Sequence, residues 1–463
     1  MFVLDHNTQV PFYAQLYRQF RAHVLSGKLA THVKLPSVRG LAGELSISRN
    51  TVETCYQELL AEGYIYSKPR SGYFVSTLDQ GVAAAALPYK PGRAKTRPES
   101  PVRYDFHPAR LDRESFPAPL WRKLFVDSLR ENSSRLAQAG DILGDWDLRH
   151  NVQSYLERSR GVVCGPEQVV ICSGLQHSLG IIAKLLQDRH HLVAVEDPGY
   201  NLSRTVFRNH ALTVFPVPVE SDGLDMEALK SSGSTLVYVT PSHQYPMGYV
   251  MPIACRLKLI EWSDSGEKYI IEDDYDSELR YHGKPIPSVQ GLRPGGNIIY
   301  LGSFSKIFSP ALRMSYMVLP RPLLAAHKRR FKYHLSTVSL LEQRTLARFM
   351  EQGHWDRHVR RMRMRYKKKH DVLLDAVERC FGNRAVVTGQ GAGLHVVLRL
   401  LDNPFSEREL LRRAIAEGIH LLPLSSYFER AGSGSISMLL GFGGMSAGEI
   451  EQGIGLLSRI WRP

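Results

Sequence analysis

Apolar side chains recur every third or fourth residue in the first sixty residues of the chain, and this spacing predicts helices. Every fourth residue from Phe12 to Val24 is apolar, and the run ends at a serine and a glycine. We expect two further helices after Ser37 and Ser48, because serine accepts hydrogen bonds from the first free backbone N–H groups of a helix. The next stretch, YIYSKPRSGYFV, alternates across a turn with proline and glycine and predicts a two-stranded hairpin.

A different pattern begins after about residue 103, where short apolar runs alternate with segments of helical length. The runs are QVVIC, HLVAVED, STLVYVTP, KYIIEDD and NIIYLGS. Near-continuous apolar strands of this kind belong to a mostly parallel sheet that helices cover on both faces. Two later runs, GLHVVLRL and SISMLLGF, predict strands of a smaller α+β subdomain that starts near residue 330. The fold expected for this part of the chain is therefore α/β.

Between these two patterns lies a stretch without apolar periodicity, residues 77–103, which is rich in alanine, proline and basic residues. Such a composition indicates a linker. We therefore expect a domain over residues 1–78, a linker over 79–103 and a second domain over 104–463, with the small subdomain at roughly 330–463. The positive charge of the linker allows contact with DNA, although a solvated tether is the favoured interpretation.

Composition narrows the class of protein. The 463 residues are 43% hydrophobic and 22% charged, as in ordinary globular proteins, and the formal net charge of +14 favours a polyanionic partner without proving one. The five cysteines form no C-x-x-C pair and the histidines show no metal-ligand spacing, so we expect neither disulfides nor a metal site. The N-terminus lacks a signal-peptide pattern and no apolar run is long enough to cross a bilayer, which favours a cytoplasmic protein without membrane contact.

The second and third predicted helices, followed by the hairpin, have the order of a helix-turn-helix with a wing. The later helix would place its first residues in the major groove of DNA, where arginine can pair with guanine and asparagine with adenine. The candidate DNA-contacting residues lie at the start of that helix, on or just before the preceding helix, or at the hairpin turn: Lys34, Arg39, Ser48, Arg49, Asn50, Thr51, Lys68, Arg70 and Gly72. A helical bundle with solvated cations is the alternative.

Four segments in a fixed order carry a resemblance to a known module. L-P-S-x-R-x-L-A, S-R-x-T-V, L-x-x-E-G and a closing G-Y-F-V resemble the GntR-type winged helix, over residues 11–76 or so. The combination is specific, because four ordered segments leave little room for coincidence. The resemblance implies that a double-stranded DNA operator is a partner of the protein.

The segment GSFSKIFSPALR, which contains Lys306, carries a second candidate site. A lysine that forms an imine with an aldehyde needs an anionic cofactor held nearby, and a phosphate can anchor such a cofactor. Hydroxyl groups, a guanidinium and the N–H groups at a helix start are suited to bind phosphate. Such groups are offered by Ser303, Ser305 and Arg313, and by Gly174, Leu175 and Gln176 after the strand QVVIC.

Two other predicted strands end in residues suited to a pyridine ring. YIIEDDY ends in carboxylates and a phenol, and a buried carboxylate such as Asp273 keeps a ring nitrogen protonated. Tyr275 would bond to the ring oxygen, and Tyr200 in EDPGYNLSR would stack on the ring face. All these segments lie at the carboxyl ends of predicted parallel strands, where an open α/β sheet binds its ligands.

These segments, together with GDWDLRHNVQSYLERSRG, SGLQHSL and PSHQYPMG, resemble the fold-type I aminotransferases that use pyridoxal 5'-phosphate (PLP). The resemblance extends from about residue 104 to the end of the chain. It implies that Lys306 forms the Schiff base with PLP, that Asp273 pairs with the pyridine nitrogen and that Tyr275 bonds to the neighbouring ring oxygen. It also implies that the two serines, Arg313 and the helix start at 174–176 bind the phosphate.

Two positions depart from the pattern of these enzymes. Tyr245 stands where many relatives have the asparagine of N-P-T-G, which contacts the cofactor oxygen. Leu439 stands where transaminases usually place an arginine for the substrate α-carboxylate, and a leucine offers no guanidinium, so ordinary transamination of α-amino acids is in doubt. Arg204 and Arg430 are alternative partners for an anionic effector, although an unplaced arginine is more often a salt-bridge partner.

A GntR-type winged helix joined to an aminotransferase-like domain is the layout of the MocR family, also called GabR-type. The resemblance implies a PLP-dependent DNA-binding transcriptional regulator that senses a small amine, an amino acid or PLP itself. It also implies a homodimer, in which each winged helix can be swapped onto the large domain of the partner. The alternative is a functional PLP-dependent aminotransferase with an accessory DNA-binding domain. The basic segment RHVRRMRMRYKKKH, residues 357–370, either extends the DNA contact or, as favoured, is the solvated face of a helix.

Overall fold

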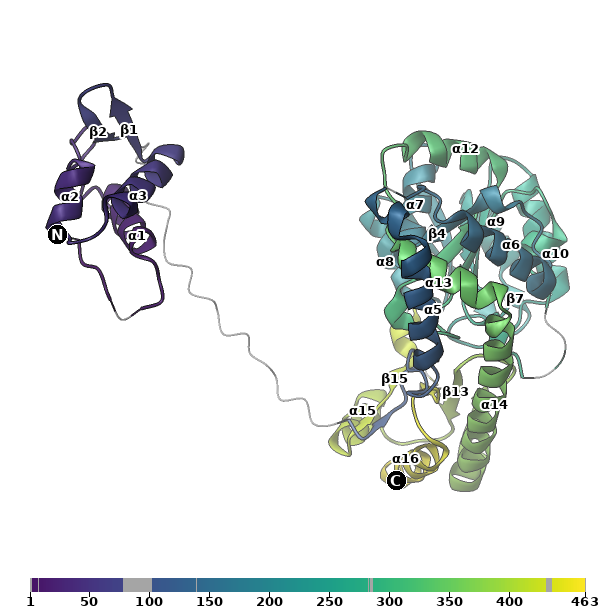
Figure 1. Ribbon diagram of the computed structural model, residues 1–463. Helices are drawn as coiled ribbons and strands as arrows, with labels where there is room; N and C mark the ends of the chain where they lie inside the picture. The colour runs from purple at the N-terminus through teal and green to yellow at the C-terminus, as the bar shows by residue number, and fades with distance from the viewer. Residues whose placement is uncertain are drawn as a thin grey trace. The chain divides into compact units, whose positions relative to one another are not determined.

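The computed structural model describes residues 2–6, 8–77, 102–138, 140–281, 283, 286–429 and 435–462. The chain forms two compact units, one on each side of residues 78–101 (Figure 1). The predicted linker, residues 79–103, therefore lies almost wholly outside the described residues, and its ends stay predictions. Within the described ranges, none of the helices combines the length and the apolar character that a membrane span requires.

The first unit contains three helices and a hairpin, as the sequence predicts. Its elements are α1 (Phe12–Leu25), α2 (Val38–Glu44), α3 (Arg49–Ala61), β1 (Ile65–Lys68) and β2 (Gly72–Val75). The side chains of Ser37 and Ser48 accept hydrogen bonds from the backbone N–H groups of Gly40 and Thr51, at 3.0 and 3.1 Å, so both predicted helix starts are confirmed. Apolar side chains from all five elements form one core.

The second unit is built on an eight-stranded sheet with the order β4-β11-β10-β9-β8-β5-β6-β7. The strands are β4 (Val169–Cys172), β5 (Leu192–Asp197), β6 (Thr213–Glu220), β7 (Gly223–Leu224), β8 (Leu236–Val239), β9 (Tyr269–Asp274), β10 (Ile298–Ser303) and β11 (Ser315–Val318). Neighbouring strands from β10 to β6 are parallel, whereas β11 and β7 are antiparallel to their neighbours. The five predicted strands are all present, and the sheet is mostly parallel as expected.

Helices cover both faces of this sheet, because successive strand residues point to opposite sides. The helices of the second unit are α5 (Ala118–Glu131), α6 (Trp146–Arg160), α7 (Leu175–Leu186), α8 (Asn201–Asn209), α9 (Met226–Ser231), α10 (Ile253–Asp264), α11 (Val289–Leu292), α12 (Arg321–Arg330), α13 (Leu340–Glu351), α14 (His354–Phe381), α15 (Glu407–Ala416) and α16 (Ala447–Ile460). Val193 and Val195 of β5 share a core with α7, α8 and α12. Ala194, between them, shares the opposite core with α9 and α10. Both faces are therefore apolar, which explains the near-continuous apolar strands.

A smaller antiparallel sheet, with the order β12-β13-β16-β15, lies in the C-terminal part of the second unit together with α14, α15 and α16 (Figure 1). Its strands are β12 (Ala385–Thr388), β13 (His395–Leu400), β15 (Leu422–Pro423) and β16 (Ser437–Gly441). The short strand β3 (Tyr104–Asp105) pairs in parallel with β14 (Ile419–His420), so the start of this unit is joined to its C-terminal part. The sequence placed that start with the large sheet, because a strand of two residues has no periodicity to detect.

The basic segment 357–370 lies within α14 and is helical, as predicted. Arg365 and Lys369 form ion pairs with Asp112, at 2.8 and 2.6 Å, and so attach the helix to the start of the unit. Arg360 and Lys368 are exposed to solvent. Some basic residues of the segment therefore support the fold through ion pairs, and others lie on a helix face that is exposed to solvent.

Candidate cofactor and DNA-binding sites

The segment with Lys306 connects two antiparallel neighbours in the large sheet, β10 and β11. Ser303 and Ser315 lie opposite each other in the register, so the chain leaves and re-enters the sheet at the same edge. Lys306 and Arg313 are therefore held near the carboxyl ends of the parallel strands. Arg313 has a φ of +48°, a left-handed backbone conformation that directs the chain back into β11.

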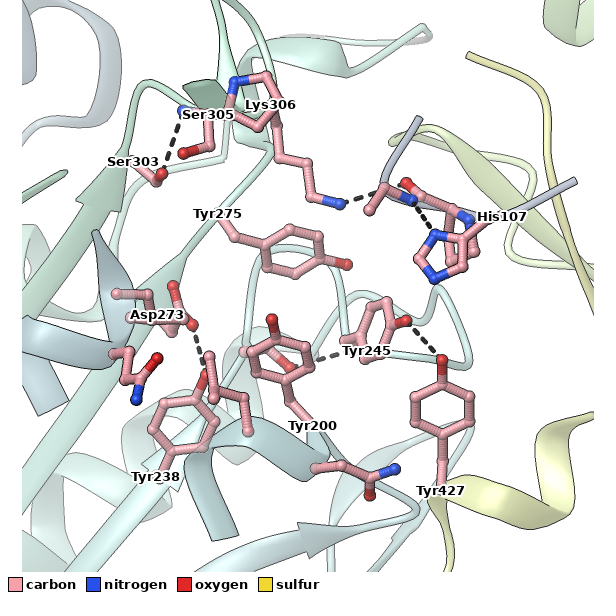
Figure 2. A pocket seen from close by; sticks show the side chains of 18 of the residues that line it. His107, Tyr200, Tyr238, Tyr245, Asp273, Tyr275, Ser303, Ser305, Lys306 and Tyr427 are labelled. Carbon is pink, nitrogen blue, oxygen red and sulfur yellow. Dashed lines mark hydrogen bonds between the residues drawn. The ribbon is translucent and has the colours of Figure 1, made fainter. Parts of the chain in front are cut away.

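A cavity of about 410 Å³ opens at this edge of the sheet (Figure 2). Ten of the eleven predicted cofactor-binding residues line it: Leu175, Gln176, Tyr200, Tyr245, Asp273, Tyr275, Ser303, Ser305, Lys306 and Arg313. They lie at or just beyond the carboxyl ends of β4, β5, β8, β9 and β10. The parallel sheet thus brings together residues that are far apart in the sequence.

The remaining predicted residue, Gly174, directly precedes the first turn of α7. Its φ is +90°, and a β-carbon at this position would lie 2.8 Å from Nη2 of Arg313. The glycine therefore lets the guanidinium approach the helix start, where the backbone N–H groups lack helical partners. Nearby, the Ser303 hydroxyl oxygen accepts a hydrogen bond from the backbone N–H of Ser305 at 3.1 Å. This group of donors is suited to bind a phosphate.

Gly174→Val is expected to weaken PLP binding, because a side chain would strain the left-handed backbone and displace Arg313 from the helix start. Loss of one hydrogen bond to a charged group costs about 1.5–3 kcal/mol, which corresponds to roughly 10- to 150-fold in affinity. The measurement is a titration of cofactor-free protein with PLP, followed by visible absorbance. Gly455→Ala, in open space on α16, is the control. Equal affinity of the valine variant and the wild type would contradict the assignment of the phosphate site.

The side chain of Lys306 points into the cavity, and its Nζ donates a hydrogen bond to the carbonyl oxygen of Pro108 at 3.2 Å (Figure 2). Burial lowers the pKa of this lysine, while the carboxylates of Asp276 and Asp273 oppose the shift. A lowered pKa increases the fraction of neutral amine, which is the form that attacks a carbonyl carbon. The position of Lys306 and its lowered pKa are therefore compatible with covalent attachment of an aldehyde.

Three consecutive carboxylates end β9, and one of them faces the cavity. Glu272 accepts hydrogen bonds from two backbone N–H groups at the start of α11. Asp274 forms an ion pair with Arg160 at 2.6 Å. Asp273, which is 3% exposed, lines the cavity and accepts a hydrogen bond from the Tyr238 hydroxyl. The alternation of side chains along a strand separates the roles of these neighbours.

The environment of Asp273 fits a cationic ligand atom. Burial raises the pKa of Asp273 to about 7, the hydrogen bond from Tyr238 opposes this shift, and the carboxylates of Asp274 and Asp276 add to it. Within the described part of the chain, no lysine or arginine forms an ion pair with this carboxylate. A protonated pyridine nitrogen would supply the missing positive charge. The residues present therefore fit the cofactor that the sequence implies.

Asp273→Asn is expected to stabilise the cofactor-free protein more at pH 8 than at pH 5. The folded pKa of about 7 lies above the value of about 3.9 of an unfolded aspartate, so the folded state holds the proton more tightly. The contribution of Asp273 to the free energy of unfolding is most favourable below about pH 4 and is lost as the pH rises from about 4 to 7. The measurement is the melting temperature of both proteins at both pH values. A difference between variant and wild type that does not grow with pH would contradict the raised pKa.

Tyr275 is held by two buried residues that the sequence analysis did not single out, His243 and Asp276. Nδ1 of His243 lies 2.9 Å from Oδ2 of Asp276 and 3.0 Å from the hydroxyl oxygen of Tyr275. A carboxylate only accepts hydrogen bonds, so Nδ1 carries a proton, and this single N–H is shared between Asp276 and the Tyr275 oxygen. The phenol proton of Tyr275 is then left for an acceptor in the cavity. A β-carbon at Gly393 would lie 2.3 Å from Cε1 of His243, so this glycine makes room for the arrangement.

Nine further residues line the cavity, and the sequence analysis gave them no role. They are His107, Pro108, Ala109, Asn201, Leu202, Tyr238, Thr240, Pro310 and Tyr427. Four of them could have been predicted from their position, because Asn201 and Leu202 directly follow Tyr200, and Tyr238 and Thr240 lie near the end of the predicted strand STLVYVTP. Tyr427 and the segment 107–109 lie far from every motif, and nothing in their local sequence marks them.

Arg204 does not line the cavity. Its guanidinium forms an ion pair with Asp197 at 3.0 Å and donates a hydrogen bond to the carbonyl oxygen of Tyr427 at 2.9 Å. The side chain is buried, and these contacts tie α8 to β5 and to the segment of Tyr427. In the structure, Arg204 is therefore a salt-bridge partner and does not face the cavity. The other effector candidate, Arg430, lies outside the described residues.

The predicted base-contacting residues of the first unit lie in the first turn of α3. Arg49 and Asn50 are exposed there. The hydroxyl groups of Ser48 and Thr51 are hydrogen-bonded to each other at 2.8 Å, and Ser48 also caps the helix, so both have structural roles. Arg39 is exposed on α2. Arg49 and Asn50 are thus the two side chains at this end whose polar groups are most available to DNA bases.

The remaining predicted DNA-contacting residues gather at the hairpin. Lys34 pairs with Phe74 through an isolated bridge, next to the wing strands. The ammonium group of Lys68 lies 5.0 Å from the ring centre of Phe74, a cation–π contact. Arg70 and Gly72 have φ values of +62° and +104° and form the turn. The hairpin therefore presents Lys34, Lys68 and Arg70 as a group of exposed cations.

Comparisons with known proteins agree with this division into two units. Residues 12–75 match the model of the bacterial regulatory proteins of the gntR family, and residues 109–442 match that of the class I and II aminotransferases. An uncharacterized HTH-type transcriptional regulator of Bacillus subtilis, YdeL, is 40% identical over 99% of this chain and 98% of its own. The probable rhizopine catabolism regulatory protein MocR of Rhizobium meliloti is 34% identical, with coverage of 99% and 95%.

The HTH-type pyridoxine biosynthesis transcriptional regulator PdxR of Corynebacterium glutamicum is 28% identical over 94% of this chain and 92% of its own. Among solved structures, the kynurenine aminotransferase of Pyrococcus horikoshii is similar, with a TM-score of 0.70 and 25% identity. That similarity covers 78% of this chain and 91% of the aminotransferase. The second unit therefore has the fold of these enzymes, and the full-length relatives are regulators by name.

Proposed function

The chain belongs to the MocR family of HTH-type transcriptional regulators, which join a GntR-type winged helix to an aminotransferase-like domain, and from this we propose that it is a DNA-binding regulator with PLP as its cofactor. It binds a DNA operator through the first unit and senses a small amine, an amino acid or PLP itself through the second. The observation that carries the cofactor part is the convergence of Lys306, Asp273 and Arg313 on one cavity.

PLP, when bound, supplies an aldehyde that reacts reversibly with primary amines. In this proposal Lys306 attaches that aldehyde, and Asp273 holds the proton on the ring nitrogen. Tyr275 donates its phenol proton to the neighbouring ring oxygen, because His243 already occupies the other side of its hydroxyl. Arg313, the two serines of the same segment and the N–H groups at the start of α7 bind the phosphate.

A bound effector can change DNA affinity only if it favours one arrangement of the DNA-binding units over another. We propose a homodimer, in which two winged helices engage two half-sites and each can cross to the large unit of the partner. The two-fold symmetry usual for helix-turn-helix dimers supports this assembly. Aminotransferase activity, if present, is residual in this proposal.

DNase I footprinting tests this function. The probe is the DNA upstream of the protein's own coding sequence and of its neighbouring genes, with cofactor-free and PLP-loaded protein. We expect a protected operator whose affinity changes with PLP or with added amine. Steady conversion of an amino acid and a keto acid at ordinary turnover, without any protected DNA, would contradict the proposal. That result would favour an aminotransferase with an accessory DNA-binding domain.

A further inference from the structure

The charges around the cavity are distributed unevenly. Among the described residues that line it, three are basic: Lys306, Arg313 and His107. Arg313 lies against Gly174 at the phosphate end, and Lys306 is the attachment point. Nδ1 of His107 accepts a hydrogen bond from the backbone N–H of Ala109 at 3.1 Å, as a neutral ring does, and burial lowers the pKa of this side chain. Once the cofactor is bound, no positive charge of the described lining is left for a second anion.

The wall opposite the phosphate end is made of phenol rings. Figure 2 shows Tyr245 and Tyr427 on the far side of the cavity from Ser303 and Ser305, with Tyr200 next to them. The Tyr245 ring meets the rings of Tyr200 and Tyr427 edge to face, each at 5.3 Å between ring centres. This wall therefore offers aromatic surface.

The polar groups of this wall do not provide the positive charge that would bind a carboxylate of the effector. The Tyr245 hydroxyl donates a hydrogen bond to the Tyr427 hydroxyl at 3.0 Å, which leaves the phenol protons of Tyr427 and Tyr200 as neutral donors. A neutral donor binds a carboxylate less strongly than a guanidinium does. Leu439 is fully buried and belongs to the same apolar cluster as the rings of Tyr245 and Tyr427. Arg204, whose guanidinium contacts the carbonyl oxygen of Tyr427, is also held by Asp197 and the main-chain oxygen of Glu196.

Three carboxylic acids also lie near the cavity. Asp273 and Asp276 lie beneath it, and both raise the pKa of Lys306 through their negative charge. Glu196 is buried behind Thr240, whose hydroxyl donates a hydrogen bond to it at 2.6 Å. A carboxylate that entered this cavity would lose its water, gain no free cation from the described lining residues and face these acids.

From this distribution we propose that the effector is a primary amine that carries no carboxylate, with an aromatic, apolar or cationic remainder that packs on Tyr200, Tyr245 and Tyr427. The inference rests on the proposed function, because it assumes the cofactor aldehyde at Lys306. Phenol faces accept apolar groups and attract cations, and both contacts suit such a remainder. The sequence alone left a small amine, an amino acid and PLP itself as possible effectors, so the cavity narrows the choice of effector.

The reaction with such an effector needs no co-reactant. The C=N bond between the aldehyde carbon and Nζ of Lys306 is exchanged for a C=N bond between the same carbon and the effector nitrogen. The two hydrogens that the neutral incoming amine loses are transferred to Nζ, which leaves as a primary amine. Neither partner is oxidised or reduced.

Matched pairs of ligands test the proposal, because the members of each pair differ only in the carboxylate. The full-length PLP-loaded protein is titrated with phenethylamine and phenylalanine, and separately with putrescine and ornithine, at one pH. The readout is the visible absorbance of the bound cofactor. We expect the amine of at least one pair to bind about tenfold or more tightly than its amino acid, because no ionic partner compensates the carboxylate. The amine of each pair is more basic than its amino acid, so a smaller fraction of it is in the unprotonated form that reacts. This difference in basicity would weaken the apparent binding of the amine and so opposes the expected result.

The outcomes of these titrations distinguish the inference about the effector from the proposed function. Amino acids that bind as tightly as the amines, or more tightly, would overturn the inference, and so would a loaded protein whose absorbance none of the four ligands changes. Purified protein that acquires no absorbance from PLP would instead contradict the proposed function. The failure of the inference and the failure of the function are therefore distinguishable.

Variants test the stated cause. Leu439→Arg places a guanidinium behind the phenol wall, and Tyr427→Arg places one in the wall itself at a position with more room. We expect at least one of them to improve phenylalanine binding relative to phenethylamine by about tenfold. Leu439→Met is the matched control, since it changes shape without adding charge. If both arginine variants fold, as judged by circular dichroism, and neither shifts the ratio, a missing cation is not what excludes the carboxylate.

Discussion

Lys306→Ala is expected to abolish covalent attachment of PLP and the visible absorbance that accompanies it, while the affinity of the protein for DNA is retained. Lys306 carries the one primary amine among the described residues that line the cavity, and neither Arg313 nor His107 can replace it. The predicted DNA-contacting residues all lie in the first unit. The two functions should therefore separate when the lysine is removed.

The measurement combines absorbance after incubation with PLP and electrophoretic mobility shift of an operator duplex, both on cofactor-free preparations. Lys258→Ala, an exposed lysine on α10, is the matched control and should keep the absorbance. Absorbance that survives in the Lys306 variant would contradict the attachment site. Loss of all DNA binding in that variant would contradict separable roles.

Arg49→Ala is expected to weaken operator binding by about 1–3 kcal/mol, which corresponds to roughly 5- to 150-fold. Arg49 is exposed in the first turn of α3, the position from which a recognition helix contacts base edges in the major groove. A contact to a base also carries specificity, so the loss should be larger on the operator than on duplex DNA of random sequence. Fluorescence anisotropy with both duplexes at one salt concentration measures the two effects.

Arg18→Ala is the control for this variant, because Arg18 is exposed on α1 and its removal changes the net charge equally. An Arg49 variant that loses affinity equally on both duplexes would indicate a phosphate contact instead of a base contact. A variant that also loses the cofactor absorbance would show that the two units depend on each other more than proposed.

Much of the fold follows from the hydrophobic pattern. The five predicted strands are near-continuous apolar runs because both faces of the sheet are covered, as Val193 and Ala194 illustrate by packing in opposite cores. The caps at Ser37 and Ser48 mark their helices correctly, since a capping serine has a local cause. Strands β6 and β11 and the pairing of β3 with β14 were not predicted, because they depend on partners distant in sequence.

The candidate site was predictable where residue type and strand-end position coincide. This applies to the segment of Lys306 and to the carboxylates of β9. The sequence alone, however, gave little reason to prefer Asp273 over Asp274. The structure resolves that choice physically, because Asp273 lines the cavity whereas Asp274 is paired with Arg160. Tyr427 completes the cavity from a segment with no motif, so no local pattern could have placed it there.

Reduction of the PLP-loaded protein with sodium borohydride, followed by proteolysis and mass spectrometry, tests the central claim most directly. Reduction converts the reversible link between the aldehyde and an amine into a stable bond, so the labelled side chain can be mapped. The account predicts one phosphopyridoxyl group per chain, on Lys306. A label on another residue, or no label on protein that has been saturated with PLP, would contradict it.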